Sequence, residues 1–187
     1  SGFPGHECER LLNLARLSLL DMDADDFADQ LFDLADRHDI TWDCDLDNVV
    51  ATVVSNCMWR GCEDVSTIDF TDMVWLPVVN GWLRGDYSWL FVDECQDVSA
   101  AARTLLIGSV RPGGRILWVG DRKQAIYGFA GADAHSFQAI IDECSATVLP
   151  LSVCYRCSTS ALDVARQWCP QIEPRADAPA GVVRTAT

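Results

Sequence analysis

Apolar residues recur at the spacing of an α-helix through the first sixty residues of the chain. Side chains three and four residues apart lie on one face of a helix, so each such run predicts a helix with an apolar side to bury. Three runs occur: Leu11, Leu12, Leu14, Ala15 and Leu19; Ala24, Phe27, Ala28, Leu31, Leu34 and Ala35; and Leu46, Val49, Val50, Val53, Val54 and Cys57.

The pattern changes at about residue 66, where shorter apolar runs replace the helical stripes. Residues 68–76 predict a short helix that stops near Pro77 and the Asn80-Gly81 turn, because proline cannot donate the next helical hydrogen bond and Asn-Gly favours a turn. Residues 89–92 (WLFV) and 116–119 (ILWV) are unbroken apolar runs. Runs of this length predict strands that are buried on both faces of a sheet.

Helices and strands alternate through the second half of the chain. Strands that alternate with helices predict a parallel sheet, so the expected fold class is α/β. The other expected elements are a helix capped by Ser99 and ending near 107, a turn at 112–114 (PGG), a helix at about 133–142, a strand at about 147–151, a helix at about 158–168, and a linker-like tail after Pro170.

Charge is divided unevenly between the two halves. The net charge of the 187 residues is −14. Residues 1–97 hold 5 Lys and Arg against 21 Asp and Glu, which sum to −16, whereas residues 98–187 hold 9 against 7, which sum to +2. This excludes a phosphate-binding surface along the whole chain, and any anion site is expected in the second half.

The cysteines are expected to be reduced thiols without a zinc ion. There are 9 cysteines, an odd number, scattered through a chain in which no signal peptide is evident. Cys154 and Cys157 form a CxxC pair, but no second pair of matching spacing supplies the other ligands of a tetrahedral zinc site. No apolar run approaches the roughly 18 residues that a membrane span needs, so no membrane association is expected.

Acidic residues follow both of the most apolar predicted strands. Asp93 and Glu94 come after the first, and Gly120 and Asp121 come after the second. In open α/β sheets, ligands bind beyond the carboxyl ends of the strands. One carboxylate there can hold Mg²⁺, and a neighbour can polarise the water that attacks a γ-phosphorus. The pattern therefore favours a magnesium–nucleotide site.

Three segments carry a family resemblance when they are taken together. They are 92–97 (VDECQD), 119–133 (VGDRKQAIYGFAGAD) and 149–158 (LPLSVCYRCS), and 69–73 (DFTDM) precedes them. Their order and spacing resemble helicase motifs II, III and IV of the UvrD/Rep/PcrA-like family of superfamily 1 DNA helicases. The 69–73 segment resembles the DFxDL-type segment of that family. The resemblance covers about residues 66–170, and its most specific part is motif III.

The resemblance implies a RecA-like parallel sheet with flanking helices, preceded by a helical segment. Residues 1–65 would be the tail of an inserted helical subdomain, 66–150 part of the first RecA-like ATPase domain, and 151–187 the start of the second. It also implies ATP and Mg²⁺ as cofactors, single-stranded DNA as the partner, and a cytoplasmic protein that works on the DNA of the nucleoid.

The resemblance also implies roles for individual residues of the nucleotide site. Asp93 would hold Mg²⁺, and Glu94 would orient and deprotonate the attacking water. Gln124 would contact the γ-phosphate and report its presence to the DNA side. Arg156 would reach the same phosphate from the second RecA-like domain and stabilise charge in the transition state.

Tyr127 and Phe129 resemble the residues on which the family stacks DNA bases, a contact that reads no sequence. Their structural alternative is a place in the core under the sheet. Gln124 could instead satisfy a buried backbone group at a strand end, and Arg156 could pair with Asp163.

The sequence departs from the family pattern at several positions. Ala130 stands where many relatives carry Arg, and Phe129 stands where Trp is frequent. No GxxxxGK[ST] loop occurs, and the single lysine, Lys123, is followed by Gln. No lysine can therefore serve the β- and γ-phosphates from a glycine-rich turn. We expect a section of a longer helicase, partnered by the remaining parts of that chain and unable to hydrolyse ATP alone.

Three functions compete. The first is part of an ATP-dependent DNA helicase that moves along single-stranded DNA. The second is a non-catalytic relative that keeps the sheet as a binding or scaffolding module, against which the four retained catalytic residue types argue. The third is a Mg²⁺-dependent phosphotransferase or nuclease using Asp93, Glu94 and Asp121. It would need a further carboxylate at a neighbouring strand end, and it leaves Tyr127-Gly128-Phe129 and Arg156 without a role.

Overall fold

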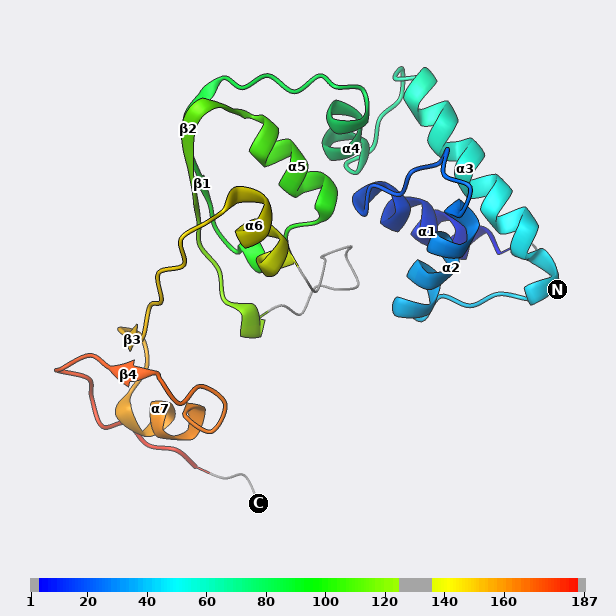
Figure 1. Ribbon diagram of the computed structural model, residues 1–187. Helices are drawn as coiled ribbons and strands as arrows, with labels where there is room; N and C mark the ends of the chain where they lie inside the picture. The colour runs from blue at the N-terminus through cyan, green and yellow to red at the C-terminus, as the bar shows by residue number, and fades with distance from the viewer. Residues whose placement is uncertain (1–3, 125–135, 185–187) are drawn as a thin grey trace. The chain divides into compact units, whose positions relative to one another are not determined.

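The computed structural model describes residues 4–124 and 136–184 of the chain (Figure 1). It divides into two compact units, residues 1–145 and residues 146–187. The first unit contains a helical core and a parallel strand pair, and the second contains a smaller strand pair with one helix. Parallel strands combined with helices are compatible with the expected α/β class.

The three helices predicted before residue 60 are confirmed. Their apolar stripes meet in one core, in which Leu11, Leu31 and Val50 are each 0% exposed. Trp75 and Leu76 from a fourth helix complete that core. The four helices are α1 (Gly5–Leu17), α2 (Phe27–Arg37), α3 (Asp47–Glu63), which follows the short 3-10 helix η1 (Cys44–Leu46), and α4 (Asp72–Val79).

Helix α4 begins at Asp72 rather than at residue 68, and it ends just before the predicted Asn80-Gly81 turn rather than at Pro77. Pro77 lies inside the helix, which continues to Val79. A proline inside so short a helix removes only one backbone hydrogen bond, and its fixed φ angle is compatible with the helical conformation. Asn80 ends the helix, where both its backbone N–H and its side-chain amide donate to the carbonyl of Leu76, at 3.0 and 3.1 Å.

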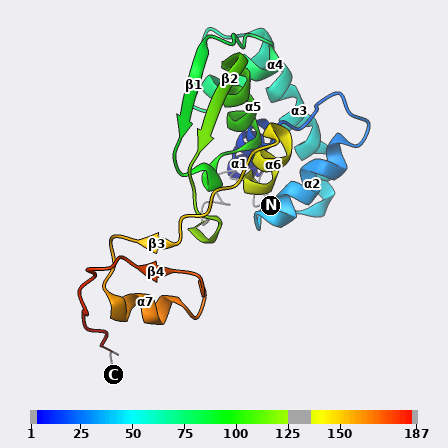
Figure 2. The ribbon, with the colours of Figure 1, turned by 60° about the vertical axis from the view of Figure 1, so that its left-hand side comes forward.

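A parallel strand pair forms the second part of this unit. Strands β1 (Tyr87–Val92) and β2 (Val110–Trp118) are connected through α5 (Ala100–Gly108), whose N-cap Ser99 accepts from the backbone N–H of Ala102 as predicted. Helix α6 (Ser136–Cys144) lies with α5 on the same side of the pair (Figures 1 and 2). The core between them comprises Leu90, Val92, Cys95, Val98, Leu106, Ile116, Trp118, Phe137 and Ile140.

The expectation that these strands are buried on both faces is wrong. Trp89 and Phe91 are 55% and 70% exposed, and Leu117, the partner of Phe91 in the register, is 47% exposed. The reason is that α5 and α6 both pack on the face of Val92. On the other face, the Arg115 guanidinium lies 5.5 Å from the centroid of the Trp89 ring and leaves that ring largely exposed. On that face the rings of Trp89 and Phe91 stack with centroids 6.2 Å apart.

Residues 112–114 do not turn the chain as predicted, because they lie inside β2. The strand accommodates them through an irregularity. Tyr87 pairs with Val110, but Trp89, only two residues later, pairs with Arg115. Gly113 adopts a positive φ of 77°, a conformation that costs glycine little, so the extra residues bulge without ending the strand.

The second unit contains short elements only. Strands β3 (Val153–Cys154) and β4 (Glu173–Pro174) pair in parallel, and helix α7 (Thr159–Ala165) connects them. The strand predicted at 147–151 is wrong, because residues 146–152 form neither helix nor strand and Leu151 is 91% exposed. The tail predicted as a linker contributes β4 instead. In the described part of the chain, none of the helices has the length and apolarity that crossing a membrane requires.

Candidate functional site

The carboxyl ends of β1 and β2 lie side by side. Val92 pairs with Trp118 in the register, and the N–H of Val119 donates to the carbonyl of Val92 at 2.8 Å. The N–H of Cys95 then donates to the carbonyl of Val119 at 2.9 Å, so the two chains remain joined beyond the last paired residues. The acidic residues after the two strands therefore share one edge of the sheet.

A backbone turn follows β1 at the first acidic pair. Glu94 adopts φ 52° and ψ 41°, the left-handed region that non-glycine residues rarely enter. The carboxylate of Asp93 accepts from the N–H of Glu94 at 2.9 Å and supports this conformation. The chain then enters the 3-10 helix η2 (Cys95–Asp97). Both acidic side chains remain exposed, and such strained positions cluster at functional sites.

A buried glutamine links the two strand ends. Gln96 is 3% exposed, and its side-chain nitrogen donates to Glu94 Oε2 at 2.7 Å and to Asp97 Oδ2 at 3.3 Å. Its side-chain oxygen accepts from the backbone N–H of Asp121 at 3.0 Å. One amide therefore connects the carboxylate after β1 to the backbone after β2.

Asp121 organises the loop after β2. Its carboxylate accepts from the N–H of Lys123 and from the side-chain amide of Gln124, each at 2.9 Å. The Gln124 amide and then the Lys123 N–H lower the pKa of Asp121 below the ordinary aspartate value. These contacts hold the 3-10 helix η3 (Arg122–Gln124). Gln124 is exposed, and the partner of its side-chain amide within the described residues is a carboxylate rather than a buried backbone group.

Gly120 is required by the close approach of these two loops. A Cβ atom at this position would lie 2.6 Å from the side-chain oxygen of Gln96 and 2.7 Å from the sulfur of Cys95. Both neighbours are buried, at 3% and 1% exposed, and neither can move far. Any side chain at position 120 would therefore push the two strand ends apart.

Gly120→Ala should lower the free energy of unfolding of the chain by about 1–3 kcal/mol, the usual cost of overpacking a tight site. Gly61→Ala is the matched control, because its Cβ would lie 3.5 Å from the Trp75 ring, an ordinary contact, inside helix α3. That variant should be neutral or stabilised by about 0.5–1 kcal/mol. Denaturant unfolding of both variants measures the difference; equal stabilities would show that the loops do not pack closely at Gly120.

The remaining predicted site residues lie elsewhere in the chain. Arg156 belongs to the second unit, between β3 and α7, and its side chain is exposed. The carboxylate of Asp163, its suggested alternative partner, pairs with Arg166 at 2.5 Å. Tyr127 and Phe129 lie outside the described residues, so both interpretations of these rings remain predictions.

Sequence reasoning missed Gln96. The available signal was a polar residue two positions after Glu94, within a segment otherwise interpreted only through its acids. A side chain with both a donor and an acceptor can bridge a carboxylate and a backbone N–H, but the sequence does not indicate that Gln96 is buried between two loops.

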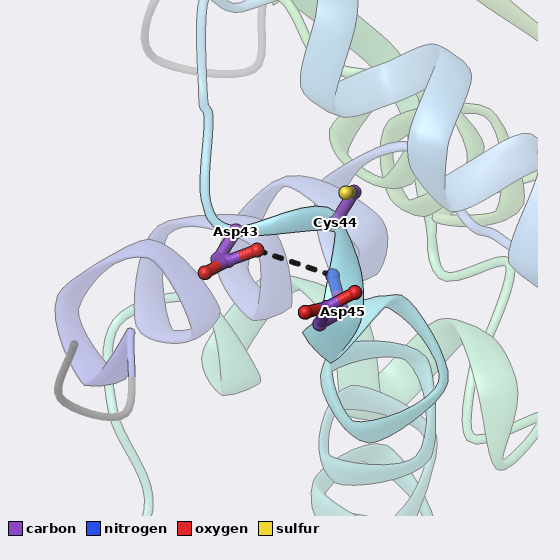
Figure 3. A group of neighbouring side chains, drawn as sticks. All are labelled: Asp43, Cys44 and Asp45. Carbon is purple, nitrogen blue, oxygen red and sulfur yellow. Dashed lines mark hydrogen bonds between the residues drawn. The ribbon is translucent and has the colours of Figure 1, made fainter.

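The exposed carboxylates after β1 are suitable ligands for a metal ion. Asp93 and Glu94 offer exposed oxygen atoms at a strand end, and Mg²⁺ in nucleotide sites is held by one or two carboxylates together with phosphates and water. These residues fit such an ion. In the described part of the chain, one group of three potential ligands also occurs, Asp43, Cys44 and Asp45 (Figure 3). Capping explains it, because Asp43 accepts from the N–H of Asp45 at 3.3 Å at the start of η1.

Comparison with known proteins assigns the chain to a family. The family model of the UvrD/REP helicase N-terminal domain matches residues 18–145, which is more than half of the chain. The match includes both strand ends, Gln96 and the segment that contains Tyr127 and Phe129. No curated protein matches the chain. From the family match and the segments that resemble motifs II and III, the chain belongs to the UvrD/REP helicase family.

Proposed function

We propose that the chain is part of an ATP-dependent DNA helicase that couples Mg-ATP hydrolysis to movement along single-stranded DNA. The observation that carries this proposal is the connection between two strand ends of a UvrD/REP family member. Glu94 after β1 and the Asp121–Gln124 loop after β2 are joined through the amide of Gln96. A helicase motor needs such a connection, because the residue that activates water must be linked to the residue that senses the γ-phosphate.

In the proposed reaction, Asp93 holds Mg²⁺ and Glu94 orients and deprotonates the water that attacks the γ-phosphorus. Mg²⁺ would neutralise charge on the phosphates when bound there. Glu94 suits the role of base because its carboxylate is exposed while one oxygen is held by the amide of Gln96. A base held in one orientation removes the proton without first paying the entropy of being ordered.

Gln124 and Arg156 complete the proposed nucleotide site. Gln124 stands on the loop directly after β2, where its exposed amide can exchange the Asp121 carboxylate for a phosphate oxygen. Arg156 is exposed in the second unit and is proposed to reach the same phosphate. Arginines that stabilise transition-state charge in this way contribute about 10³–10⁵ in rate.

The domain assignment is also part of the proposal. Residues 66–150 contribute to a first RecA-like domain, 151–187 begin the second, and 1–65 are the end of a helical subdomain. The chain contains no GxxxxGK[ST] loop, so we propose that a longer chain supplies it and that these 187 residues alone do not hydrolyse ATP. The protein is proposed to act on DNA in the cytoplasm.

The proposed action on DNA can be tested with a longer helicase chain that carries both the phosphate-binding loop and this sequence. That protein should hydrolyse ATP faster when single-stranded DNA is added. Replacing Tyr127 and Phe129 together with Ala should weaken single-strand affinity by about 1–3 kcal/mol per stacked base and reduce DNA stimulation. Nucleotide binding without DNA should not change, because neither ring is assigned to the nucleotide.

The matched control is Trp59→Ala, which removes an exposed aromatic ring from α3 and should leave DNA affinity unchanged. Unchanged affinity in the Tyr127 and Phe129 variant would place those rings in the core. DNA binding without any ATP hydrolysis by the longer chain would instead favour the non-catalytic module.

A further inference from the structure

We propose that Gln96 is a positioning residue that couples the base Glu94 to the phosphate-sensing loop after β2. The inference rests on the proposed function of Glu94 and Gln124. Its physical basis is a continuous series of side-chain hydrogen bonds, from the carboxylate of Glu94 to the Gln96 amide, and from there to the backbone of Asp121, whose carboxylate holds Gln124.

The orientation of the Gln96 amide is determined by its partners. The backbone N–H of Asp121 can only donate, so the side-chain oxygen of Gln96 must face it, at 3.0 Å. The side-chain nitrogen then faces the carboxylates of Glu94 and Asp97, which can only accept when ionised. Reversing the amide would place like atoms together at every contact, so a single orientation is possible.

The surroundings prevent the Gln96 side chain from moving away. It is 3% exposed, and Gly120 leaves no room for a Cβ beside its oxygen. The turn that contains Cys95 is also held by α6, because the hydroxyl of Ser136 at the start of that helix donates to the carbonyl of Cys95 at 3.3 Å. A displacement of the loop after β2 must therefore move Gln96, and Gln96 must carry the carboxylate of Glu94 with it.

This geometry gives Gln96 a function that a merely buried polar residue would lack. When a phosphate draws Gln124 away from Asp121, the loop after β2 shifts, and the shift reaches Glu94 through one amide. The base is then in its productive orientation only when the sensing loop is in its nucleotide-bound position. Such coupling would suppress ATP hydrolysis when Gln124 on the sensing loop does not contact the γ-phosphate.

Two substitutions of Gln96 separate its contact with Glu94 from its contact with the backbone of Asp121. Gln96→Glu keeps the side-chain length and the acceptor for the Asp121 N–H, but in its ionised form it replaces the donor that holds Glu94 with a second carboxylate that repels it. Gln96→Met keeps a similar volume and removes both contacts. In the 187-residue chain without nucleotide, amide hydrogen exchange at Asp121 should accelerate about tenfold in Gln96→Met and remain near the wild-type rate in Gln96→Glu.

In the longer helicase, both variants should lower kcat by about 100-fold, the cost of misplacing a catalytic group by about 1 Å. The KM for ATP and the affinity for a non-hydrolysable ATP analogue should change less than about twofold, because neither variant touches the nucleotide. In a Glu94→Gln background, Gln96→Met should reduce residual hydrolysis no further, since Gln96 acts through Glu94.

The outcomes separate this inference from the function on which it rests. If Glu94→Gln leaves hydrolysis undiminished, the proposed function fails, and the Asp121 exchange still decides whether Gln96 holds the loop. If Glu94→Gln abolishes hydrolysis but both Gln96 variants keep full kcat, only the inference is overturned. Additive losses in the double variant overturn it too, because they indicate a general structural role. Should Gln96→Met fail to fold, Gln96→Glu alone decides through kcat.

Discussion

Glu94→Gln should abolish ATP turnover in a helicase that contains this chain and leave ATP binding largely intact. The amide has almost the shape of the carboxylate, and its oxygen can still accept from the side chain of Gln96, as Glu94 Oε2 does at 2.7 Å. The geometry of the strand ends should therefore persist. Only the capacity to take a proton from water is lost, and general bases contribute about 10²–10⁴ in rate.

The measurement is steady-state hydrolysis with saturating single-stranded DNA, together with equilibrium binding of a non-hydrolysable ATP analogue. Glu9→Gln is a suitable control, because Glu9 is exposed on α1 and the same chemical change there should leave kcat unaltered. Undiminished hydrolysis by Glu94→Gln would falsify Glu94 as the base. A loss of nucleotide affinity as large as the loss of kcat would assign Glu94 to binding instead.

The helices were predictable because the spacing of their apolar residues shows which face is buried. The stripes that contain Leu11, Leu31 and Val50 distinguish an apolar from a polar face, and those residues are buried. The strand run at 89–92 contains four apolar residues in succession and does not distinguish one face from the other. Its burial on one face could be learned only from the place of α5 and α6.

The site was predictable to the extent that it depends on topology. Parallel strands end at one edge of a sheet, so the residues after β1 and β2 could be placed together without coordinates. The contacts of Gln96 could not, because they depend on a left-handed turn at Glu94 and on the absence of a side chain at Gly120. These features arise from the meeting of two loops, which no local pattern describes.

A second feature that local patterns did not indicate is a buried cation on α1. Arg16 is 6% exposed and donates to Asp72 at 2.5 Å, to Asp69 at 2.9 Å and to Asn13 at 2.7 Å. Its carboxylate partners lie 53 and 56 residues away in sequence, so sequence spacing could not reveal them. The two aspartates belong to the 69–73 segment that resembles the family's DFxDL-type segment, and the structure gives that segment a physical role.

The same two aspartates also begin helix α4. The N–H of Asp72 donates to the carboxylate of Asp69 at 2.7 Å, and the N–H of Asp69 donates to the carboxylate of Asp72 at 3.0 Å. This reciprocal arrangement satisfies backbone N–H groups at a helix start, as in a capping box. Arg16 therefore neutralises the carboxylates that define the first turn of α4, and so joins α4 to α1.

Arg16→Met should lower the free energy of unfolding of the chain by about 3–5 kcal/mol, because removing one partner leaves the other buried charge uncompensated. The side chain of Asp72 is only 10% exposed, so water cannot replace the lost cation. Arg10→Met is the control on the same helix, since Arg10 is exposed and its hydrogen bond within the described residues is a long one, 3.5 Å to the carbonyl of His38. It should change stability by less than about 0.5 kcal/mol.

The stability loss in Arg16→Met could come from an uncompensated buried charge or from a cavity. The pH dependence of stability and a second substitution distinguish these two causes. Burial raises the pKa of Asp69, but the Asp72 N–H and Arg16 outweigh it and lower the pKa below the ordinary aspartate value. A lowered pKa contributes stability above that value and loses it as the pH falls through the folded-state pKa. Arg16→Met should therefore lose less stability than the wild type between neutral and acidic pH. Asp72→Leu, added to Arg16→Met, should recover part of the lost free energy of unfolding at neutral pH. If the loss came from a cavity alone, the free-energy costs of the two substitutions would add.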